Sequence, residues 1–245
     1  MAVPDFAARP QLSEDVARLV RKRIFDGSYP AGKYVRLDQL ATELGISVTP
    51  VREALFELRA EGLLTQQPHR GFLVLPVTER DLVDVADIQA HIGGELAARA
   101  AARISDEQIG ELDQIQTQLE SAYAGDEGRT VRLNHDFHRA INVAADSPKL
   151  AQMMSRITRY APESVFPTIA GWPERSIRDH RRLLSALAEH DETLARAVMA
   201  EHLTSGVAPL IRHLTRCGVI GPGRPAGNTA DPDSQPDQAP STAGA

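Results

Sequence analysis

The sequence has little of several residue types, and each shortage excludes a class of protein. Its 245 residues include one cysteine, Cys217, so neither an intrachain disulfide nor a cysteine-rich zinc module can form. No apolar run approaches the roughly 18 residues that a membrane-spanning helix needs. The first ten residues include Asp5 and lack an apolar stretch, so we expect no signal peptide, no membrane association and a cytoplasmic location.

Charge is unevenly distributed along the chain. The 33 acidic residues outnumber the 27 basic ones, which excludes a protein made of a single basic nucleic-acid surface. Residues 11–76 contain nine basic and eight acidic side chains, whereas residues 77–216 contain sixteen and twenty-one. The change near Pro76 therefore predicts a nearly neutral first domain and an acidic second one.

The expected organisation has two domains between two tails. The first domain covers residues 12–76 and the second covers 77–216. Residues 1–11 show no periodicity, and residues 217–245 are rich in Gly, Pro, Ala, Asp, Ser and Gln. Segments with so few large apolar residues cannot offset the entropy of ordering, so we expect both tails to be disordered.

The first domain has the pattern of a winged helix-turn-helix. Its predicted elements are helices over 14–26, 37–44 and 48–61 and strands over 63–66 and 72–75. Ser13 is the candidate N-cap of the first helix, and Gly27 ends it. Pro50 is tolerated in the first turn of the third helix, where a missing N–H costs little. In this arrangement the third helix enters the major groove and the hairpin lies beside it.

The same residues resemble a known family. Residues 37–55, followed by 61–64 and 70–74, are similar to the GntR family of bacterial transcription regulators over nearly all of residues 13–75. The resemblance implies binding to double-stranded DNA. The family's third helix usually opens Ser-Arg-Thr-Pro-Val-Arg. Val48 replaces its first arginine here, which favours an apolar contact with a thymine methyl group.

Six residues are expected to contact DNA. Arg52 is suited to reading a guanine edge, and the hydroxyls of Ser47 and Thr49 are suited to binding phosphate. Arg70 at the tip of the wing enters the minor groove or holds phosphate, and the glycine after it permits a positive φ. The alternative for Arg52 is an ion pair with Glu53 or Glu57. The full set is Arg36, Ser47, Thr49, Arg52, Arg70 and Gly71.

The second domain lacks strand alternation and predicts an all-α bundle of six or seven helices, so the fold class is mainly α. Gly93-Gly94 marks a candidate break in the first of these helices. Ser105 with Gln108, and Asp191, are good helix-starting signals. The expected helices cover about 79–102, 105–123, 128–144, 148–160, 173–189 and 191–214.

Three histidines are expected to face the interior of this bundle. Asn134 and His138 are four residues apart, so they share one face of a helix. His180 and His202 lie on the apolar faces of the last two helices, which a tight turn would bring together. Buried imidazoles cost desolvation energy unless they are paired or ligated. The pattern favours a divalent metal over histidines that are merely hydrogen-bonded in a core.

A second resemblance concerns this bundle. The segments 134–138, 179–180 and 201–202 are similar to the FCD ligand-binding domain of the FadR-type branch of the GntR family. The resemblance implies that Asn134, His138, His180 and His202 bind zinc or nickel below an effector cavity. Asn134 stands where many relatives have Asp, which weakens metal affinity and favours an anionic ligand. Candidate effector anchors are His91, Arg156 and Arg159.

These observations predict a transcription regulator, most simply a repressor, and not an enzyme. A symmetric homodimer would bind a short palindromic operator, and a small carboxylate would coordinate the metal and change operator affinity. The linker 76–78 would transmit the change. In one alternative the metal itself is the signal. In another the metal is catalytic, with Asp136 or Asp179 as the base, but both residues should face elsewhere on their helices.

Overall fold

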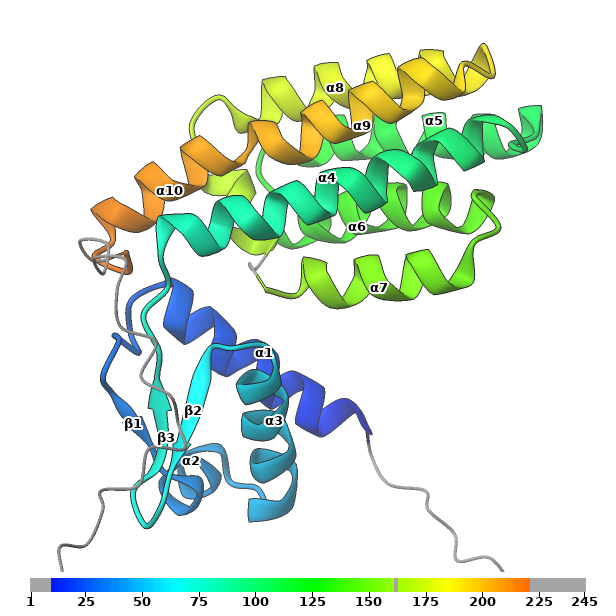
Figure 1. Ribbon diagram of the computed structural model, residues 1–245. Coiled ribbons are helices and arrows are strands. Elements are labelled where there is room, and N and C mark those ends of the chain that lie inside the picture. Colours follow the sequence, from blue (N-terminus) through cyan, green and yellow to red (C-terminus); the bar gives the residue numbers. More distant parts are fainter. Residues whose placement is uncertain (1–9, 161–162, 221–245) are drawn as a thin grey trace, which may run out of the picture.

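The computed structural model describes residues 10–160 and 163–220, which form two mainly helical domains (Figure 1). In the first domain three helices pack beside a three-stranded antiparallel sheet of order β1-β3-β2. Its elements are α1 (Pro10–Phe25), β1 (Tyr34–Val35), α2 (Leu37–Leu44), α3 (Val48–Ala60), β2 (Leu64–Gln67) and β3 (Gly71–Val74). The predicted order of helices and hairpin is confirmed. The predicted tails lie outside the described residues over 1–9 and 221–245.

Two glycines set the turns of this domain. Gly45 ends α2 in the left-handed conformation, with φ of 65°, and so begins the turn into α3. Gly71 begins β3 with φ of 98°, as the sequence predicted. A Cβ atom there would lie 2.6 Å from the carbonyl oxygen of Val35, so the close approach of β1 to the wing also requires glycine.

Two details of the first domain differ from prediction. Helix α1 begins at Pro10, so Ser13 lies inside the helix and is not its N-cap. Strand β1 was not predicted, because two residues are too few to show a period. It forms because Tyr34 and Val35 pair with Leu73 and Phe72 of β3.

The core of the first domain encloses one ion pair. Arg21 of α1 is 7% exposed, and its Nε and Nη2 atoms donate to the Glu61 carboxylate over 2.6–3.0 Å. Burial raises the pKa of Glu61, although Arg21 opposes that shift. The pair joins the middle of α1 to the end of α3, so the buried guanidinium is satisfied.

The second domain is a helical bundle that lies beside the first (Figure 1). Its elements are α4 (Glu79–Ala101), α5 (Asp106–Ala122), α6 (Glu127–Ala144), α7 (Pro148–Thr158), the 3-10 helix η1 (Glu163–Thr168), α8 (Trp172–Ala188), α9 (Glu192–Ser205) and α10 (Val207–Arg216). Ser105 and Gln108 form a capping box at the start of α5, and Asp191 caps α9, as predicted. Among the described residues no helix is both long and apolar enough to cross a membrane.

The predicted break at Gly93-Gly94 is wrong, because α4 runs through both residues. Their role is close packing against α9. A Cβ atom at Gly93 would lie 2.5 Å from Leu203 Cδ1, and one at Gly94 would lie 3.0 Å from the carbonyl oxygen of Arg196. The two helices therefore approach each other more closely than larger residues allow.

The last predicted helix is in fact two. It divides at Gly206 into α9 and α10, and both approach the first domain's end of the bundle (Figure 1). A Cβ atom at Gly206 would lie 2.8 Å from the Trp172 ring and 2.9 Å from the Phe166 ring. The aromatic side chains of α8 and η1 thus occupy the space that a side chain would need at the break.

The two domains share a hydrophobic cluster. The core of the first domain continues into Trp172 of α8 and into Leu210 and Leu214 of α10. The Phe25 and Tyr160 rings meet edge to face, with centroids 6.1 Å apart. The domains are therefore joined by packed side chains as well as by the linker.

Ion pairs and a backbone bridge add to this contact. Arg159, just after α7, donates to Glu57 of α3 at 3.1 Å and lies 3.6 Å from Glu14 of α1. Val77 and Ile220 form a parallel β-bridge, and both side chains are buried. Val219 and Ile220, which fall in the tail predicted from residue 217, pack against the hydrophobic cluster that the two domains share.

Candidate functional site

Helix α3 presents its polar face outward. Val51, Leu55 and Leu58 are fully buried against α1 and the wing. Thr49 and Arg52 consequently point to solvent, and Ser47 is exposed at the N-cap position before them. This is the orientation that a recognition helix needs, because base edges are reached by side chains on the exposed face.

The recognition helix makes one contact that the sequence did not predict. Glu57 pairs with Arg159 of the second domain and not with Arg52. Among the described residues Arg52 has no ion-pair partner, so the alternative role as an internal ion pair finds no support. The exposed Arg52 guanidinium remains available to a nucleic acid.

The wing lies at the same end of the domain as the start of α3, away from the bundle (Figure 1). Arg70 is exposed at its tip, and its Nη1 atom is 3.5 Å from the Tyr34 hydroxyl. Arg36 is exposed at the N-cap position of α2. The predicted basic side chains Arg36 and Arg70 are therefore both on the surface. Gly71 follows Arg70 and begins β3, the strand between β1 and β2.

Three imidazoles meet inside the bundle. His138 comes from α6, His180 from α8 and His202 from α9, and one candidate ligand atom of each lies within 4.8 Å of the others. Their ring centroids are 4.8–5.3 Å apart. The helix pair α8–α9 brings His180 and His202 together, as its sequence pattern suggested. We call these three residues the His cluster.

Polar atoms around the His cluster lack partners. Asn134 lies one turn before His138 on α6, and its Oδ1 atom is buried without a hydrogen bond. His180 Nε2 is also buried without a hydrogen bond, whereas His202 Nδ1, which makes no hydrogen bond of standard geometry, lies 3.5 Å from Asp179 Oδ2. Each such atom costs about 1–3 kcal/mol when unsatisfied. Neutral imidazole nitrogens and an amide oxygen are cation ligands, so this donor set fits a divalent metal.

Gln116 prepares His180 for such a role. Its amide oxygen lies 2.8 Å from His180 Nδ1, and both side chains are fully buried. With that oxygen as acceptor, the proton resides on Nδ1 and the Nε2 lone pair faces the other imidazoles. Gln116 was not predicted from the sequence, because it is a single polar residue between the buried Leu112 and Leu119 of α5.

Burial keeps two imidazoles of the His cluster neutral, those of His138 and His180. Desolvation, together with the neighbouring His202 and His135, lowers the pKa of His138 to about 3. The pKa of His180 is also lowered well below its usual value, first by burial and then by His202 and His138. Both imidazoles are therefore unprotonated at neutral pH and offer lone pairs.

A carboxylate lies beside the cluster. Asp179 is 5% exposed, and its Oδ2 atom is 3.5 Å from His202 Nδ1. Burial would raise the pKa of Asp179, but the His202 imidazole, Arg178 and Arg182 together lower it. The side chain is thus ionised, and its negative charge would help to balance a bound cation.

The three predicted effector anchors do not reach the His cluster. His91 on α4, Arg156 on α7 and Arg159 are all exposed. Arg159 instead pairs with Glu14 and Glu57 of the first domain. Helical spacing shows which residues share a face but not which faces of α4 and α7 remain on the outside.

The molecule therefore joins a winged helix-turn-helix, with its recognition face exposed, to a helical domain that holds a cluster of ligand-type side chains. This arrangement is that of a DNA-binding regulator with a separate C-terminal helical domain. Comparison with family models agrees: residues 12–74 match the bacterial regulatory proteins of the gntR family, and residues 84–205 match the FCD domain. The chain belongs to the GntR family of transcription regulators, in the branch that carries an FCD domain.

Known proteins support the same assignment. The chain is 29% identical over 201 residues to the probable D-xylose utilization operon transcriptional repressor of Paenarthrobacter nicotinovorans, covering 80% of this chain and 88% of that protein. It is 27% identical to the transcriptional repressor GlaR of Escherichia coli, covering 82% and 96%. The solved structure of E. coli McbR/YncC, 26% identical, matches with a TM-score of 0.66 over 83% and 98%. These relatives are regulators and not enzymes.

Proposed function

We propose that this protein is an effector-responsive repressor whose FCD domain holds a divalent metal, zinc or nickel. Asn134 and the His cluster would bind the metal, and a small carboxylate would bind the metal in turn. The observation that carries the proposal is that one candidate ligand atom from each histidine of the His cluster, on three different helices, lies within 4.8 Å of the others, beside the unpartnered Asn134 Oδ1 and His180 Nε2 atoms. Two of the similar proteins described above are named repressors, which favours repression as the direction of control.

The metal would supply positive charge and open coordination positions for the carboxylate of the effector. The protein supplies the orientation of the ligands, the exclusion of water and the balance of charge. Gln116 orients His180, burial excludes water from the imidazoles, and Asp179 balances charge. An effector that binds one arrangement of the domains 100-fold better than the other would contribute about 2.7 kcal/mol of coupling.

The coupling has a physical route from the His cluster to the DNA-binding domain. The Trp172 ring lies 5.6 Å from the His202 ring and also belongs to the shared hydrophobic cluster. Arg159 contacts the recognition helix itself through Glu57. These contacts act in addition to the linker at residues 76–78, in which Val77 is buried and bridged to Ile220.

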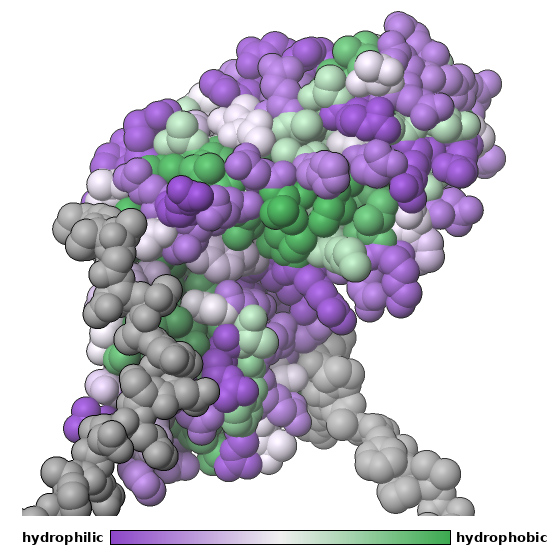
Figure 2. All heavy atoms as spheres, in the orientation of Figure 1, coloured by the Kyte–Doolittle hydropathy of each residue, from purple (hydrophilic) through white to green (hydrophobic). Residues whose placement is uncertain are grey.

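Homodimerisation is part of the proposal, because a palindromic operator requires two recognition helices. Figure 2 shows a hydrophobic area on the viewed face of the bundle, between α4 and α7. Ile88 of α4 is 51% exposed and Met153 of α7 is 53% exposed. A second copy would bury these side chains. Such a dimer would act on DNA in the bacterial cytoplasm.

The first test is native mass spectrometry of untagged protein, with metal analysis, before and after chelation. We expect a dimer that carries one divalent ion per chain. His138→Ala should lose the ion, whereas the control His91→Ala, at an exposed histidine of α4, should retain it. Full metal occupancy in His138→Ala, or a metal-free native protein that does not take up zinc or nickel, would refute the metal site.

The second test is operator binding by gel shift with the same samples. The proposal expects the metal-loaded protein to bind DNA and a carboxylate to change that affinity. If chelation alone produced the full change, the metal would be the signal, as in the alternative considered from the sequence. His138→Ala should keep partial DNA binding, because the winged helix-turn-helix packs around its own core.

A further inference from the structure

A series of hydrogen bonds runs from the His cluster to the surface of the bundle. It starts at His180 Nδ1, which is bonded to the Gln116 amide oxygen. The Gln116 amide nitrogen donates in turn to Glu120 Oε1 at 3.0 Å, and Arg181 Nε donates to the same oxygen at 2.6 Å. Gln116 and His180 are fully buried, whereas the side chains of Glu120 and Arg181 are 29% and 39% exposed. We call these four residues the orienting relay.

The Gln116 amide has two possible orientations, and they have opposite effects on His180. With the amide oxygen toward His180, Nδ1 carries the proton and Nε2 keeps its lone pair. With the amide nitrogen toward His180, Nδ1 must accept, so the proton moves to Nε2 and this lone pair is lost. His180 Nε2 is the atom that is buried without a hydrogen bond beside the other imidazoles. The orientation of one amide thus decides whether Nε2 can bind a cation.

Glu120 selects the first orientation. An ionised carboxylate only accepts hydrogen bonds, so the Gln116 nitrogen, and not its oxygen, must point toward Glu120. Arg181 lowers the pKa of Glu120, burial opposes that shift, and the bond from Gln116 lowers the pKa as well. The carboxylate is therefore ionised at neutral pH and remains an obligatory acceptor.

Arg181 holds Glu120 in place from the neighbouring helix. Its guanidinium also donates to Asp113, and to the Thr117 hydroxyl at 3.3 Å, so it contacts three positions along α5. Arg181 directly follows His180 on α8. One helix thus supplies both the imidazole and the cation that fixes the carboxylate at the far end of the relay.

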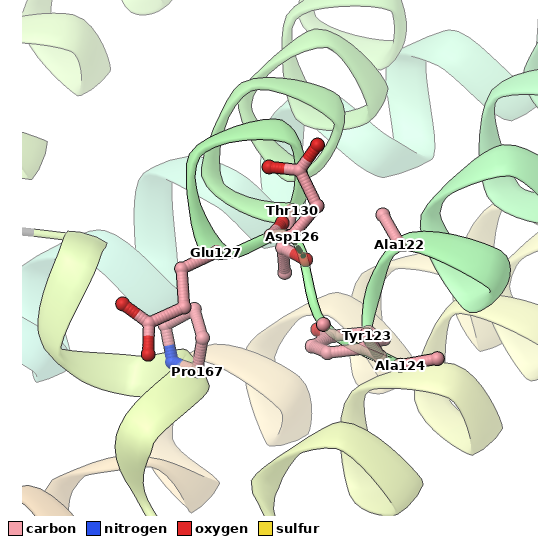
Figure 3. A pocket seen from close by; sticks show the side chains of 8 residues that line it. Ala122, Tyr123, Ala124, Asp126, Glu127, Thr130 and Pro167 are labelled. Atoms are coloured by element: carbon pink, nitrogen blue, oxygen red, sulfur yellow. Dashed lines mark hydrogen bonds between the residues drawn. The ribbon is translucent and has the colours of Figure 1, made fainter.

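The relay does not open into the hollow at the end of α5. This hollow measures about 450 Å³ and is lined by residues 122–127, Thr130 and Pro167. Figure 3 shows Glu127 beside Pro167 at the turn into α6. Among the described residues that line the hollow, none belongs to the relay. The Gln116 amide is therefore oriented by side chains of the protein and not by a solute in the hollow.

We propose that Glu120, held by Arg181, is a positioning residue for the metal: it orients the Gln116 amide and thereby fixes His180 in the tautomer that offers Nε2. The inference deepens the proposed function and rests on it for the metal, whereas the tautomer is a property of the protein alone. Removing the partners that orient a metal-binding histidine typically lowers metal affinity about 10–100-fold. Partly exposed side chains one amide away from His180 would therefore control how strongly the His cluster holds an ion.

The first measurement is the tautomer of His180 in full-length, chelator-treated protein. Nitrogen-15 NMR of labelled histidines distinguishes a protonated ring nitrogen from one with a lone pair, and His180→Gln identifies the His180 signals. We expect the proton on Nδ1. Glu120→Gln should show a population with the proton on Nε2, because an amide at position 120 can donate as well as accept. The control is Glu111→Gln, at an exposed glutamate of α5. An unchanged tautomer in Glu120→Gln would overturn the proposal.

The second measurement is zinc affinity, by competition with a chromophoric chelator. Glu120→Gln should bind zinc about tenfold more weakly, and Glu111→Gln should bind it as the native protein does. Arg181→Gln should lose less, about twofold to fivefold, because Glu120 still accepts. Its control is Arg182→Gln, whose exposed guanidinium pairs with Glu201 instead. An altered tautomer with native zinc affinity would overturn the proposal, as would equal losses in Arg181→Gln and Arg182→Gln.

A swap variant separates orientation from local packing. Gln116→Glu combined with Glu120→Gln places the obligatory acceptor next to His180 and a donor one turn away, with no change in net charge. It should recover the tautomer with the proton on Nδ1 and zinc affinity within about threefold of native. A swap variant that binds zinc as weakly as Glu120→Gln would assign the loss to packing and refute the positioning role.

The outcomes separate this inference from the proposed function. Native protein that takes up neither zinc nor nickel refutes the proposed function, while the His180 tautomer in Glu120→Gln still decides whether Glu120 orients the amide. Native protein that holds its metal, with the tautomer and zinc affinity unchanged in Glu120→Gln, refutes only the positioning role.

Discussion

In the DNA-binding domain the buried Arg21 guanidinium binds the Glu61 carboxylate within 2.6–3.0 Å, whereas around the His cluster Asn134 Oδ1 and His180 Nε2 are buried without hydrogen-bond partners. The third imidazole there, His202, has its Nδ1 atom 3.5 Å from Asp179 Oδ2. A complete network fixes one structure, while buried polar atoms without partners cost stability. The buried polar groups of the first domain are therefore satisfied, and those around the His cluster are satisfied only in part.

Breaking the complete network should have the largest effect. Arg21→Met leaves the Glu61 carboxylate buried without a cation, which should cost about 3–5 kcal/mol of unfolding free energy. Urea unfolding followed by circular dichroism measures it. Arg18→Met is the control, because its pair with Asp15 is exposed and contributes little.

The same variant has a predictable pH dependence. Burial raises the pKa of Glu61 and Arg21 opposes the shift, so losing Arg21 should raise this pKa further. A carboxyl group with a raised folded-state pKa is favoured when protonated, and that advantage disappears as pH rises through the folded pKa. The stability deficit of Arg21→Met should therefore be smaller at acidic than at neutral pH. An equal deficit at both would contradict the buried-charge explanation.

A change on the exposed face of α3 should leave stability intact and affect only DNA. Arg52→Ala should weaken operator binding by about 1–3 kcal/mol if Arg52 reads a base edge. Gel shift at fixed salt measures this, with Arg103→Ala in the exposed turn after α4 as the control. Unchanged operator affinity would remove Arg52 from the interface, and a loss of the same size on random DNA would assign it to phosphate.

Asn134→Asp sharpens the contrast between satisfied and unsatisfied atoms, because its two effects have opposite signs. Without metal, a carboxylate replaces a neutral oxygen in a buried position and should lower the melting temperature. With zinc, the charged ligand should raise metal affinity about tenfold and increase the metal-induced stabilisation. Thermal melting with and without zinc tests both effects. A shift in the same direction in both states would mean that Asn134 does not face the metal.

The smallest expected effect concerns the contact between the domains. Arg159 is about half exposed, so Arg159→Gln should change stability by less than about 1 kcal/mol. Its effect should appear instead in coupling: the ratio of operator affinities with and without metal should shrink. The control is Arg156→Gln, at an exposed arginine of α7, which should leave this ratio of operator affinities unchanged. An unaltered ratio in Arg159→Gln would mean that Arg159 does not contribute to the coupling, which would then depend on Trp172 and the linker.

The DNA-binding domain was predictable because its signals are local. Gly45 and the proline in the first turn of α3 each act within a few residues, and the bounds of α2 match. The FCD domain depended on contacts between distant segments. The glycine pair in α4 serves packing against α9 and not a break, and Gly206 makes room for Trp172.

The candidate site shows the same limit. The spacing of Asn134 and His138, and the turn between α8 and α9, were enough to place three histidines together. Gln116 and Glu120 were overlooked because a single polar residue on a helix does not reveal which residue of another helix it meets. The four-residue spacing of Gln116 from Glu120 was the available clue, since it repeats the spacing of Asn134 from His138.

The β-bridge between Val77 and Ile220 has a mechanical consequence. The chain enters the FCD domain beside Val77 and leaves it beside Ile220, and the carbonyl oxygen of Cys217 lies where a Cβ atom on Gly27 would come within 3.1 Å. Val77, Ile220 and Leu214 of α10 all belong to the hydrophobic cluster that the two domains share. The linker is therefore not a free tether: the segment after α10 fixes it against both domains, so a shift of α10 would reach the linker through side chains already in contact.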